Sequence, residues 1–560
     1  MTNLQIAELL KNVASSYQYH DPNKHRFQII AYNRAADSIE HATSELKDLW
    51  DDGKLEQVPS IGTSISKHLD EIFRTGKSTH FEELMKDIPK DAFTLMILPK
   101  VGLKTAMKMI EELPKSELQQ KIKEAEKLTN KVKRHLLPYA ENIALEVVEW
   151  LKEGGNIEKI DCLGSLRRKA ATVGDIDIAV ATNKPIEVIE RFVNYPKKQK
   201  IIEKGTVTSS ILLPGDVQVD ILVMNLESYG NALQHFTGSK NHNIALREHS
   251  LKMNYSMSEH GIKNTRTGKT IGIKTEQELY KFLNLDYIEP ELREGTDEIK
   301  AALENKLPNL VKLEDIKGDL QIHSNFDIDT SHDLGINSME EIVKRANELN
   351  YEYIAFTEHN PSKKGHDEKQ IEEILKRKKE KIEQLNYSRE SSTPFVFNSL
   401  EIDMGKDGSL PISVKGLETL DFALVSIHSS FDLPRSVMTE RVIRALDHPN
   451  VKIFAHPTAR KINEREGVEL DWEKIFEFCL KNNKWVEINA DPMRLDLPDV
   501  LVRDAVKLGV KLTLGTDTHE VSMMDNMKYG VNIARRGWAE KKNVINCLKL
   551  EEFENELKRK

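Results

Sequence analysis

Residues 164–177 read GSLRRKAATVGDID, and this stretch decides how the first half of the 560-residue chain is interpreted. Alternate residues of a β-strand project to the same face, so Asp175 and Asp177 are predicted to direct two carboxylates to one point. The apolar run 217–222 (VQVDIL) adds Asp220 from a neighbouring strand. Such oxygen ligands suit a pair of divalent cations that bridge a triphosphate. The stretch therefore predicts a nucleotidyl-transfer site.

The residues ahead of the two aspartates offer groups that bind phosphate. A turn at Gly164 and Ser165 supplies backbone N–H groups and a hydroxyl, and Arg167 and Arg168 add positive charge. An isolated Asp-x-Asp pair is typical of a solvated strand end. The ordered combination of turn, arginines and strand carboxylates favours the catalytic interpretation instead.

The same combination resembles the palm of family X DNA polymerases, the group of polymerase beta. Residues 235–240 (HFTGSK) are similar to the family segment that lines the sugar and base of the incoming nucleotide. The resemblance implies catalysis by Asp175, Asp177 and Asp220 with Mg²⁺ or Mn²⁺. It also implies that Arg247 contacts the template, and that nucleotide is bound by Gly164, Ser165, Arg168, His235, Phe236, Gly238 and Asn243. The family commonly has Tyr where this chain has His235, which leaves ribonucleotide discrimination open.

Two similar turns precede helices in the first 150 residues. Residues 58–63 (VPSIGT) and 98–103 (LPKVGL) each place a glycine, Gly62 or Gly102, directly before a predicted helix. Such a turn presents free backbone N–H groups to a phosphate. The pair resembles helix-hairpin-helix motifs, which grip a DNA backbone independently of its sequence.

Departures from the family pattern occur in this N-terminal region. Ser60 and Lys100 stand where the hairpin motif usually has its first glycine. His68 stands where members with 5′-deoxyribose phosphate lyase activity carry a Schiff-base lysine, and Lys67 lies beside it. An imidazole cannot form the imine, so lyase activity is not expected unless Lys67 substitutes.

The C-terminal half contains a second set of candidate metal ligands. From Asp319 onward, short apolar runs alternate with helical segments, and these runs are repeatedly followed by His, Glu or Asp. This pattern is typical of a parallel barrel with its site at the carboxyl ends of the strands. The predicted ligands are His323, His359, Glu401, His428, His456, Asp517 and His519. Imidazole and carboxylate without thiolate suit Mn²⁺, Zn²⁺ or Fe.

This ordered set resembles the polymerase-and-histidinol-phosphatase (PHP) domain, a distorted (β/α)₇ barrel. Its fusion behind a family X polymerase is similar to the bacterial PolX members of that family, and the resemblance implies a Mn²⁺-dependent 3′→5′ exonuclease and end-processing activity. Gln321 replaces a family histidine, and Ile328 stands where the family has an aspartate ligand. Asp327 and Asp329 flank that position, and the sequence does not choose between them.

Composition limits the class of protein. Hydrophobic residues make up 39% and charged residues 31%, which indicates a soluble globular chain of three to five units. No apolar run reaches membrane-spanning length, residues 1–16 lack the features of a signal peptide, and only three cysteines are present. A reducing cytoplasmic location without membrane contact is expected. The net charge of −9 means that DNA binding must depend on local patches and backbone donors.

The predicted fold is multidomain α+β and α/β. Hydrophobic periodicity predicts strands over 176–181, 207–213 and 218–224, and a charged helix over 369–385. The predicted units are an N-terminal helical DNA-binding domain (1–90), a second helix-hairpin-helix domain (91–150), a polymerase-beta-like nucleotidyltransferase palm (151–226), a thumb subdomain for the nascent base pair (227–288), a linker (289–317) and the PHP domain (318–560).

The favoured function is a DNA-directed DNA polymerase that fills short gaps in base excision repair and trims 3′ ends. Its expected partners are gapped or primer-template DNA and dNTPs, and a monomer is expected. One alternative keeps the polymerase and makes the PHP domain purely structural. Another is a non-templated nucleotidyltransferase fused to a small-molecule phosphatase; the paired hairpins and Arg247 speak against it.

Overall fold

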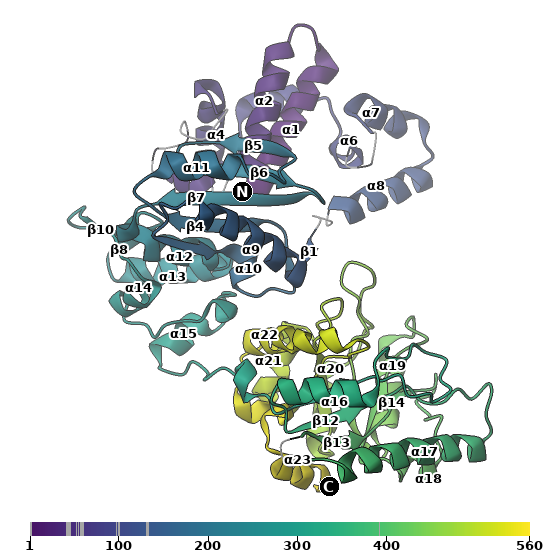
Figure 1. Ribbon diagram of the computed structural model, residues 1–560. Coiled ribbons are helices and arrows are strands. Elements are labelled where there is room, and N and C mark those ends of the chain that lie inside the picture. The colour runs from purple at the N-terminus through teal and green to yellow at the C-terminus, as the bar shows by residue number, and fades with distance from the viewer. Residues whose placement is uncertain are drawn as a thin grey trace.

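The computed structural model describes residues 3–40, 46–51, 53, 55, 61–96, 98, 101–129, 134–390 and 393–559. Figure 1 shows an upper lobe built from the N-terminal and middle parts of the chain and a lower lobe built from the C-terminal part. Within the described residues, no helix is long and apolar enough to cross a membrane.

The N-terminal part is helical and has two separate small cores. Helix α4 illustrates how its sequence selects the buried face, because Ile65, Leu69 and Ile72 recur at helical spacing and are all buried. The first core involves α1 (Asn3–His20), α2 (Arg26–Glu40), α3 (Leu46–Asp51), α4 (Thr63–Thr75) and α5 (Thr79–Met85). The second involves α6 (Lys90–Leu95), α7 (Leu103–Glu112) and α8 (Lys115–Thr129).

The middle part contains a five-stranded sheet in the order β2-β4-β7-β6-β5. Its strands are β2 (Lys159–Cys162), β4 (Ile176–Ala181), β5 (Lys200–Lys204), β6 (Thr208–Leu213) and β7 (Val217–Met224). Strands β4 and β7 are parallel, and the other neighbours are antiparallel. Ile176, Ile178 and Val180 of β4 join the core formed with α9 (Leu137–Glu153) and α11 (Pro185–Val193). The intervening side chains, beginning with Asp177, therefore project to the opposite face.

The next segment forms another part of the same lobe. A small antiparallel sheet in the order β10-β9-β8 packs with helices that surround it. Its elements are α12 (Tyr229–Thr237), α13 (Lys240–Lys252), β8 (Tyr255–Ser258), β9 (Gly261–Asn264), β10 (Thr270–Ile271), α14 (Glu276–Phe282) and α15 (Glu298–Leu303). Residues 289–317, which include α15, lead from this segment to the C-terminal lobe, and Arg293 and Val311 within them are fully buried.

The C-terminal lobe is built from parallel strands. Two sheets, β11-β12-β13 and β14-β15-β16-β17-β18, are joined by bridges between Ile322 and Thr518 and between His359 and Glu401. Only Ser399 and Leu400 separate β13 from β14, so these two act as one interrupted strand. The eight described strands therefore fill seven strand positions of the barrel. The strands are β11 (Gly318–Ile322), β12 (Tyr353–Phe356), β13 (Phe395–Asn398), β14 (Glu401–Asp403), β15 (Ala423–Ser426), β16 (Val451–Phe454), β17 (Trp485–Asn489) and β18 (Leu512–Gly515).

Helices accompany these strands in an α/β arrangement (Figure 1). They are α16 (Met339–Glu348), α17 (Glu368–Tyr387), α19 (Arg435–Leu446), α20 (Trp472–Lys481), α21 (Asp499–Leu508), α22 (Met527–Arg536) and α23 (Leu550–Lys558). Because every strand pair in the described part of this lobe is parallel, the carboxyl ends of the strands meet at one edge. The multidomain α+β and α/β prediction is confirmed.

Candidate active sites

The three predicted polymerase carboxylates converge in the middle sheet. The parallel register of β4 and β7 places Asp177 opposite Asp220, and Asp175 immediately precedes β4. One oxygen from each of the three carboxylates lies within 4.8 Å of the others. Gln218 orients Asp220, because its Nε2 donates to both carboxylate oxygens at 2.9 and 3.0 Å. The geometry is that of a site for divalent cations.

The charge balance of this cluster also fits cations. Burial and the charges of Asp175 and Asp220 hold the pKa of Asp177 well above its ordinary value. Burial raises the pKa of Asp220 to about 8, against hydrogen bonds from Ser210 and Gln218. Buried like charges destabilise a fold unless a counter-charge offsets them. Divalent cations would supply that counter-charge.

The predicted phosphate-binding turn forms the short helix α10 (Gly164–Arg167) beside the carboxylates. Gly164 has φ of 57°, and a Cβ there would lie 2.5 Å from Asp177 Oδ2, so both backbone and space require glycine. Ser165 is half-buried in this turn. Arg168 follows it, and its Nη1 donates to the carbonyl oxygen of Thr237 at 2.7 Å.

The predicted nucleotide-lining residues meet at the end of α12. Asn243 Nδ2 donates to the carbonyl oxygen of His235 at 2.6 Å, and Arg247 Nη2 lies 3.3 Å from His235 Nδ1. The rings of His235 and Phe236 pack edge to face with centroids 4.7 Å apart. Gly238 is tightly enclosed, since a Cβ there would lie 2.8 Å from Asn243 Oδ1. The structure thus brings these predicted residues together.

The two hairpin glycines occupy equivalent positions. Gly62 and Gly102 are the N-cap residues of α4 and α7, both in extended conformation, and no atom of the described residues lies within 4 Å of where a Cβ would stand on either glycine. Each glycine therefore begins a helix at an open position. Ser60 and Lys100 lie outside the described residues.

His68, at the position where the resemblance predicts a lyase lysine, packs against a second imidazole. His68 stacks on His80 with ring centroids 4.8 Å apart, and its Nδ1 lies 3.4 Å from the Ser78 hydroxyl. Burial lowers the pKa of His68, and the nearby His80 lowers it further. This environment favours a neutral imidazole.

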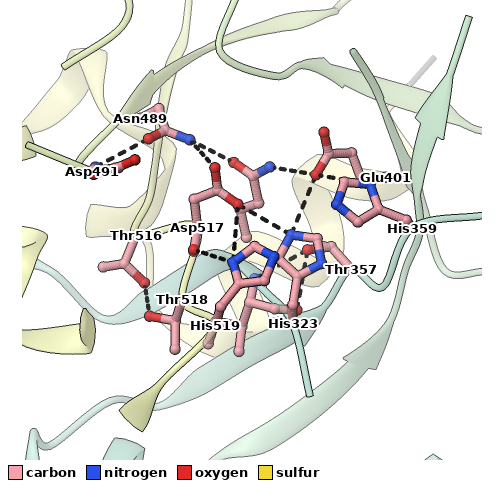
Figure 2. Close-up of polar contacts among 12 residues, drawn as sticks. His323, Thr357, His359, Glu401, Asn489, Asp491, Thr516, Asp517, Thr518 and His519 are labelled. Carbon is pink, nitrogen blue, oxygen red and sulfur yellow. Dashed lines mark hydrogen bonds and ion pairs between the residues drawn. The ribbon is translucent and has the colours of Figure 1, made fainter. Parts of the chain in front are cut away.

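The predicted ligands of the C-terminal lobe meet at the carboxyl ends of the barrel strands, and Figure 2 shows part of this cluster. Glu401 lies at its centre: its Oε2 is 3.3 Å from His323 Nε2, and its Oε1 is 2.8 Å from His456 Nε2. His428 Nε2 lies 3.3 Å from the same Oε1, and Asp517 Oδ1 lies 3.2 Å from His323 Nε2.

Four groups of candidate ligands overlap in this cluster. The ligand atoms within each group lie within 4.8 Å of one another. The groups are His323, His359 and His519; His332, His359 and His428; Glu401, His428 and His456; and His323, Glu401 and Asp517. All seven predicted ligands therefore belong to at least one group.

The polar atoms of this cluster fit metal ions. Nδ1 of His359 and Nδ1 of His456 are buried without a hydrogen-bond partner among the described residues, whereas buried polar atoms are normally paired. Burial is the main reason why the pKa of His359 is lowered to about 3. Burial also lowers the pKa of His323, but hydrogen bonds with Asp517 and Glu401 outweigh it and raise the pKa to about 10. Imidazoles facing buried carboxylates are a normal donor set for a transition metal, and a bound metal would displace the proton that His323 otherwise carries.

The sequence departures have structural explanations. Gln321 is fully buried; its Nε2 donates to Glu401 Oε2 at 2.8 Å, and its Oε1 accepts from Asn489 at 3.1 Å. Gln321 therefore orients Glu401. Ile328 is buried in the barrel core, whereas Asp327 and Asp329 are exposed and belong to none of the candidate groups.

Sequence reasoning missed His332 and Asp403. His332 Nε2 lies 2.5 Å from Asp403 Oδ2, and Asp403 Oδ1 lies 2.6 Å from His428 Nδ1. His332 thus enters the group with His359 and His428. Its position three residues after Asp329 was the available signal, but nothing local indicates that the loop turns this imidazole inward.

The whole chain aligns with a known protein. It is 32% identical over 584 aligned positions to the DNA polymerase/3′-5′ exonuclease PolX of Bacillus subtilis, and the alignment covers 100% of both chains. The chain belongs to the family X DNA polymerases. Family models agree: residues 232–294 match the DNA polymerase beta thumb, and residues 1–78 match a helix-hairpin-helix domain.

Other relatives align with part of the chain. DNA polymerase lambda of Arabidopsis thaliana is 23% identical across 52% of this chain and 62% of its own length. The repair DNA polymerase X of an African swine fever virus isolate is 28% identical across 24% of this chain and 82% of its own length.

Proposed function

We propose that this family X member is a DNA-directed DNA polymerase that fills short gaps during DNA repair and carries a 3′→5′ exonuclease in its C-terminal lobe. The single observation that carries the polymerase assignment is the convergence of three carboxylates beside the turn at Gly164. The full-length similarity to a polymerase/3′-5′ exonuclease supports both activities.

The polymerase reaction is an in-line attack by a primer 3′-hydroxyl on the α-phosphate of a dNTP, which forms the new phosphodiester bond, breaks the bond to the β-phosphate and releases pyrophosphate. Asp175, Asp177 and Asp220 would hold two Mg²⁺ or Mn²⁺ ions, which when bound stabilise the attacking and leaving oxygens. The Ser165 hydroxyl and the Arg168 guanidinium bind triphosphate oxygens.

Nucleotide and template are selected at the end of α12. His235 and Phe236 line the sugar and base, and Gly238 allows Asn243 to approach them. Asn243 and Arg247 contact the minor-groove edges of the nascent pair and the template. The turns at Gly62 and Gly102 bind the DNA backbone through main-chain N–H groups.

The exonuclease would use the barrel cluster. Mn²⁺, Zn²⁺ or Fe would be held by His323, His359, Glu401, His428, His456, Asp517 and His519, and the bound metal would polarise the scissile phosphodiester. His332 would serve in place of the aspartate that Ile328 replaces, with Asp403 orienting both His332 and His428.

The limit between the two helical domains is inferred from their separate cores. The first helical core ends at Phe81 and the second begins at Ile88, which supports a boundary near residue 90. We assign 1–90 and 91–150 to the helical domains, 151–226 to the palm, 227–288 to the thumb, 289–317 to the connection and 318–560 to the PHP domain. The monomeric state and cytoplasmic location remain predictions.

The test uses two substitutions on one full-length chain. Asp220→Ala should abolish template-directed filling of a one-nucleotide gap while 3′ trimming with Mn²⁺ continues. His456→Ala should show the reverse. Gap filling by Asp220→Ala would refute the polymerase assignment, and unchanged trimming by His456→Ala would indicate a structural barrel.

A further inference from the structure

Arg536 belongs to the barrel but reaches into the polymerase lobe. It ends α22, and its side chain is only 8% exposed. Its Nη1 donates to the carbonyl oxygen of Arg168 at 2.8 Å and lies 2.8 Å from Glu294 Oε1. Its Nε donates to Asp499 Oδ2 at 2.7 Å, which holds the guanidinium from the barrel side. One side chain therefore connects three segments.

Glu294 is shared between two arginines. Arg168 Nε also lies 3.2 Å from Glu294 Oε1, so both guanidiniums bond the same carboxylate oxygen. Without Arg536, the full charge of Glu294 would act on Arg168 alone. A carboxylate paired to one arginine competes with phosphate for that arginine more strongly than a carboxylate divided between two.

Other ion pairs secure the same interface without touching Arg168. Arg535 Nε lies 2.8 Å from Glu291 Oε1, and Arg535 Nη1 donates to the carbonyl oxygen of Val311 at 3.1 Å. Arg503 Nη2 lies 3.5 Å from Asp297 Oδ2, and Lys507 Nζ lies 3.2 Å from the same oxygen. Attachment of the two lobes therefore does not depend on Arg536 alone.

We propose that Arg536 is a positioning residue for the polymerase reaction, through which the C-terminal barrel contributes to the nucleotide site. It holds the main chain of Arg168 in place and pairs with the Glu294 carboxylate, so that the Arg168 guanidinium is available to the triphosphate of an incoming dNTP. The inference rests on the proposed polymerase function and extends it, because it makes dNTP affinity depend on a residue of the other lobe.

The experiment measures steady-state filling of a one-nucleotide gap by full-length variants. Arg536→Gln should raise the dNTP KM by about ten-fold with kcat changed less than about two-fold, because a binding contact is weakened. Arg536→Lys keeps the positive charge but loses the planar set of N–H donors of the guanidinium, and it should give an intermediate KM. Arg535→Gln is the matched control at the adjacent position, and its KM should equal that of the wild type.

A double variant tests the route through Glu294. Glu294→Gln combined with Arg536→Gln removes the competing carboxylate and should return KM most of the way to the wild-type value. The inference is overturned if Arg536→Gln has the KM of Arg535→Gln, if it lowers kcat alone, or if the double variant shows no rescue.

Two further controls separate this inference from its foundation. Wild-type protein that cannot fill the gap would refute the proposed function itself rather than the role of Arg536. Should Arg536→Gln melt well below the wild type, Asp499→Asn replaces it, since this change only loosens Arg536 from the barrel side. Asp499→Asn should raise KM about three-fold, and an unchanged KM would contradict the proposal.

Discussion

Asp220→Asn should stabilise the metal-free protein while abolishing primer extension. Asp220 is 3% exposed, and its carboxylate lies within 4.8 Å of those of Asp175 and Asp177. Two unit charges at 4.8 Å repel by about 3.5 kcal/mol at an effective dielectric constant of about 20. Asparagine keeps an oxygen that accepts from Gln218 and removes the charge. Residues that lower the stability of the folded protein are commonly retained at such sites because activity needs them.

The gain in stability from Asp220→Asn should depend on pH. Burial raises the folded-state pKa of Asp220 to about 8, whereas an unfolded aspartate has a pKa of about 3.9. The folded state therefore binds more protons than the unfolded state between these values, and stability falls as the pH rises through that window. Protonation already relieves the repulsion at pH 6, so the advantage of Asp220→Asn should be larger at pH 8.

Thermal melting in EDTA measures this effect. We expect Asp220→Asn to gain about 1–3 kcal/mol at pH 8, which corresponds to an upward shift of roughly 2–8 °C in the transition of the polymerase lobe. Glu190→Gln, at an exposed residue of α11 that pairs with Lys204, is the matched control and should change stability by less than about 0.5 kcal/mol. Melting of Asp220→Asn below the wild type at pH 8 would refute the electrostatic reasoning, and added Mg²⁺ should stabilise only the wild type.

Three further outcomes are expected. Gly164→Ala should reduce gap filling at least about 100-fold, because Gly164 has a φ of 57° and an added Cβ would collide with Asp177. Gly62→Ala is the control: the described residues leave open space around Gly62, so this change should not reduce nucleotide incorporation on saturating DNA. His332→Ala should lower the Mn²⁺ content measured by elemental analysis by about one ion per chain, and an unchanged content would exclude it as a ligand. Gln321→Leu should retain gap filling but slow 3′ trimming about 10- to 100-fold, since Glu401 loses its orienting hydrogen bond; trimming at the wild-type rate would contradict that role.

Local sequence patterns predicted much of the fold. The strand predicted over 176–181 is β4 (Ile176–Ala181), and the helix predicted over 369–385 is α17 (Glu368–Tyr387). These elements have a clear period and bury one face or both, so short-range chemistry defines them. The site motifs were also local, because Gly164, Asp175 and Asp177 lie within one turn-and-strand unit.

The candidate sites depended partly on contacts that no local pattern contains. Gln321 stands where the resemblance predicts a histidine, and its side chain supports Glu401, a residue 80 positions away. His332 reaches the ligand group only because Ile328 packs into the barrel core and the following loop folds back. Loop positions carry no periodicity, so their direction follows from packing rather than from propensity.

The sequence by itself predicted the chemistry of this protein from three carboxylates on or directly before two strands, a turn suited to phosphate and a series of imidazoles at strand ends. Tertiary structure alone decided how the two lobes share residues. Arg536 bonds Arg168 across 368 positions of the chain, and Glu294 lies between them. Residue type and spacing report which groups are available, but the pairing of distant charges is a property of the packed interface, where burial makes each of them require a partner.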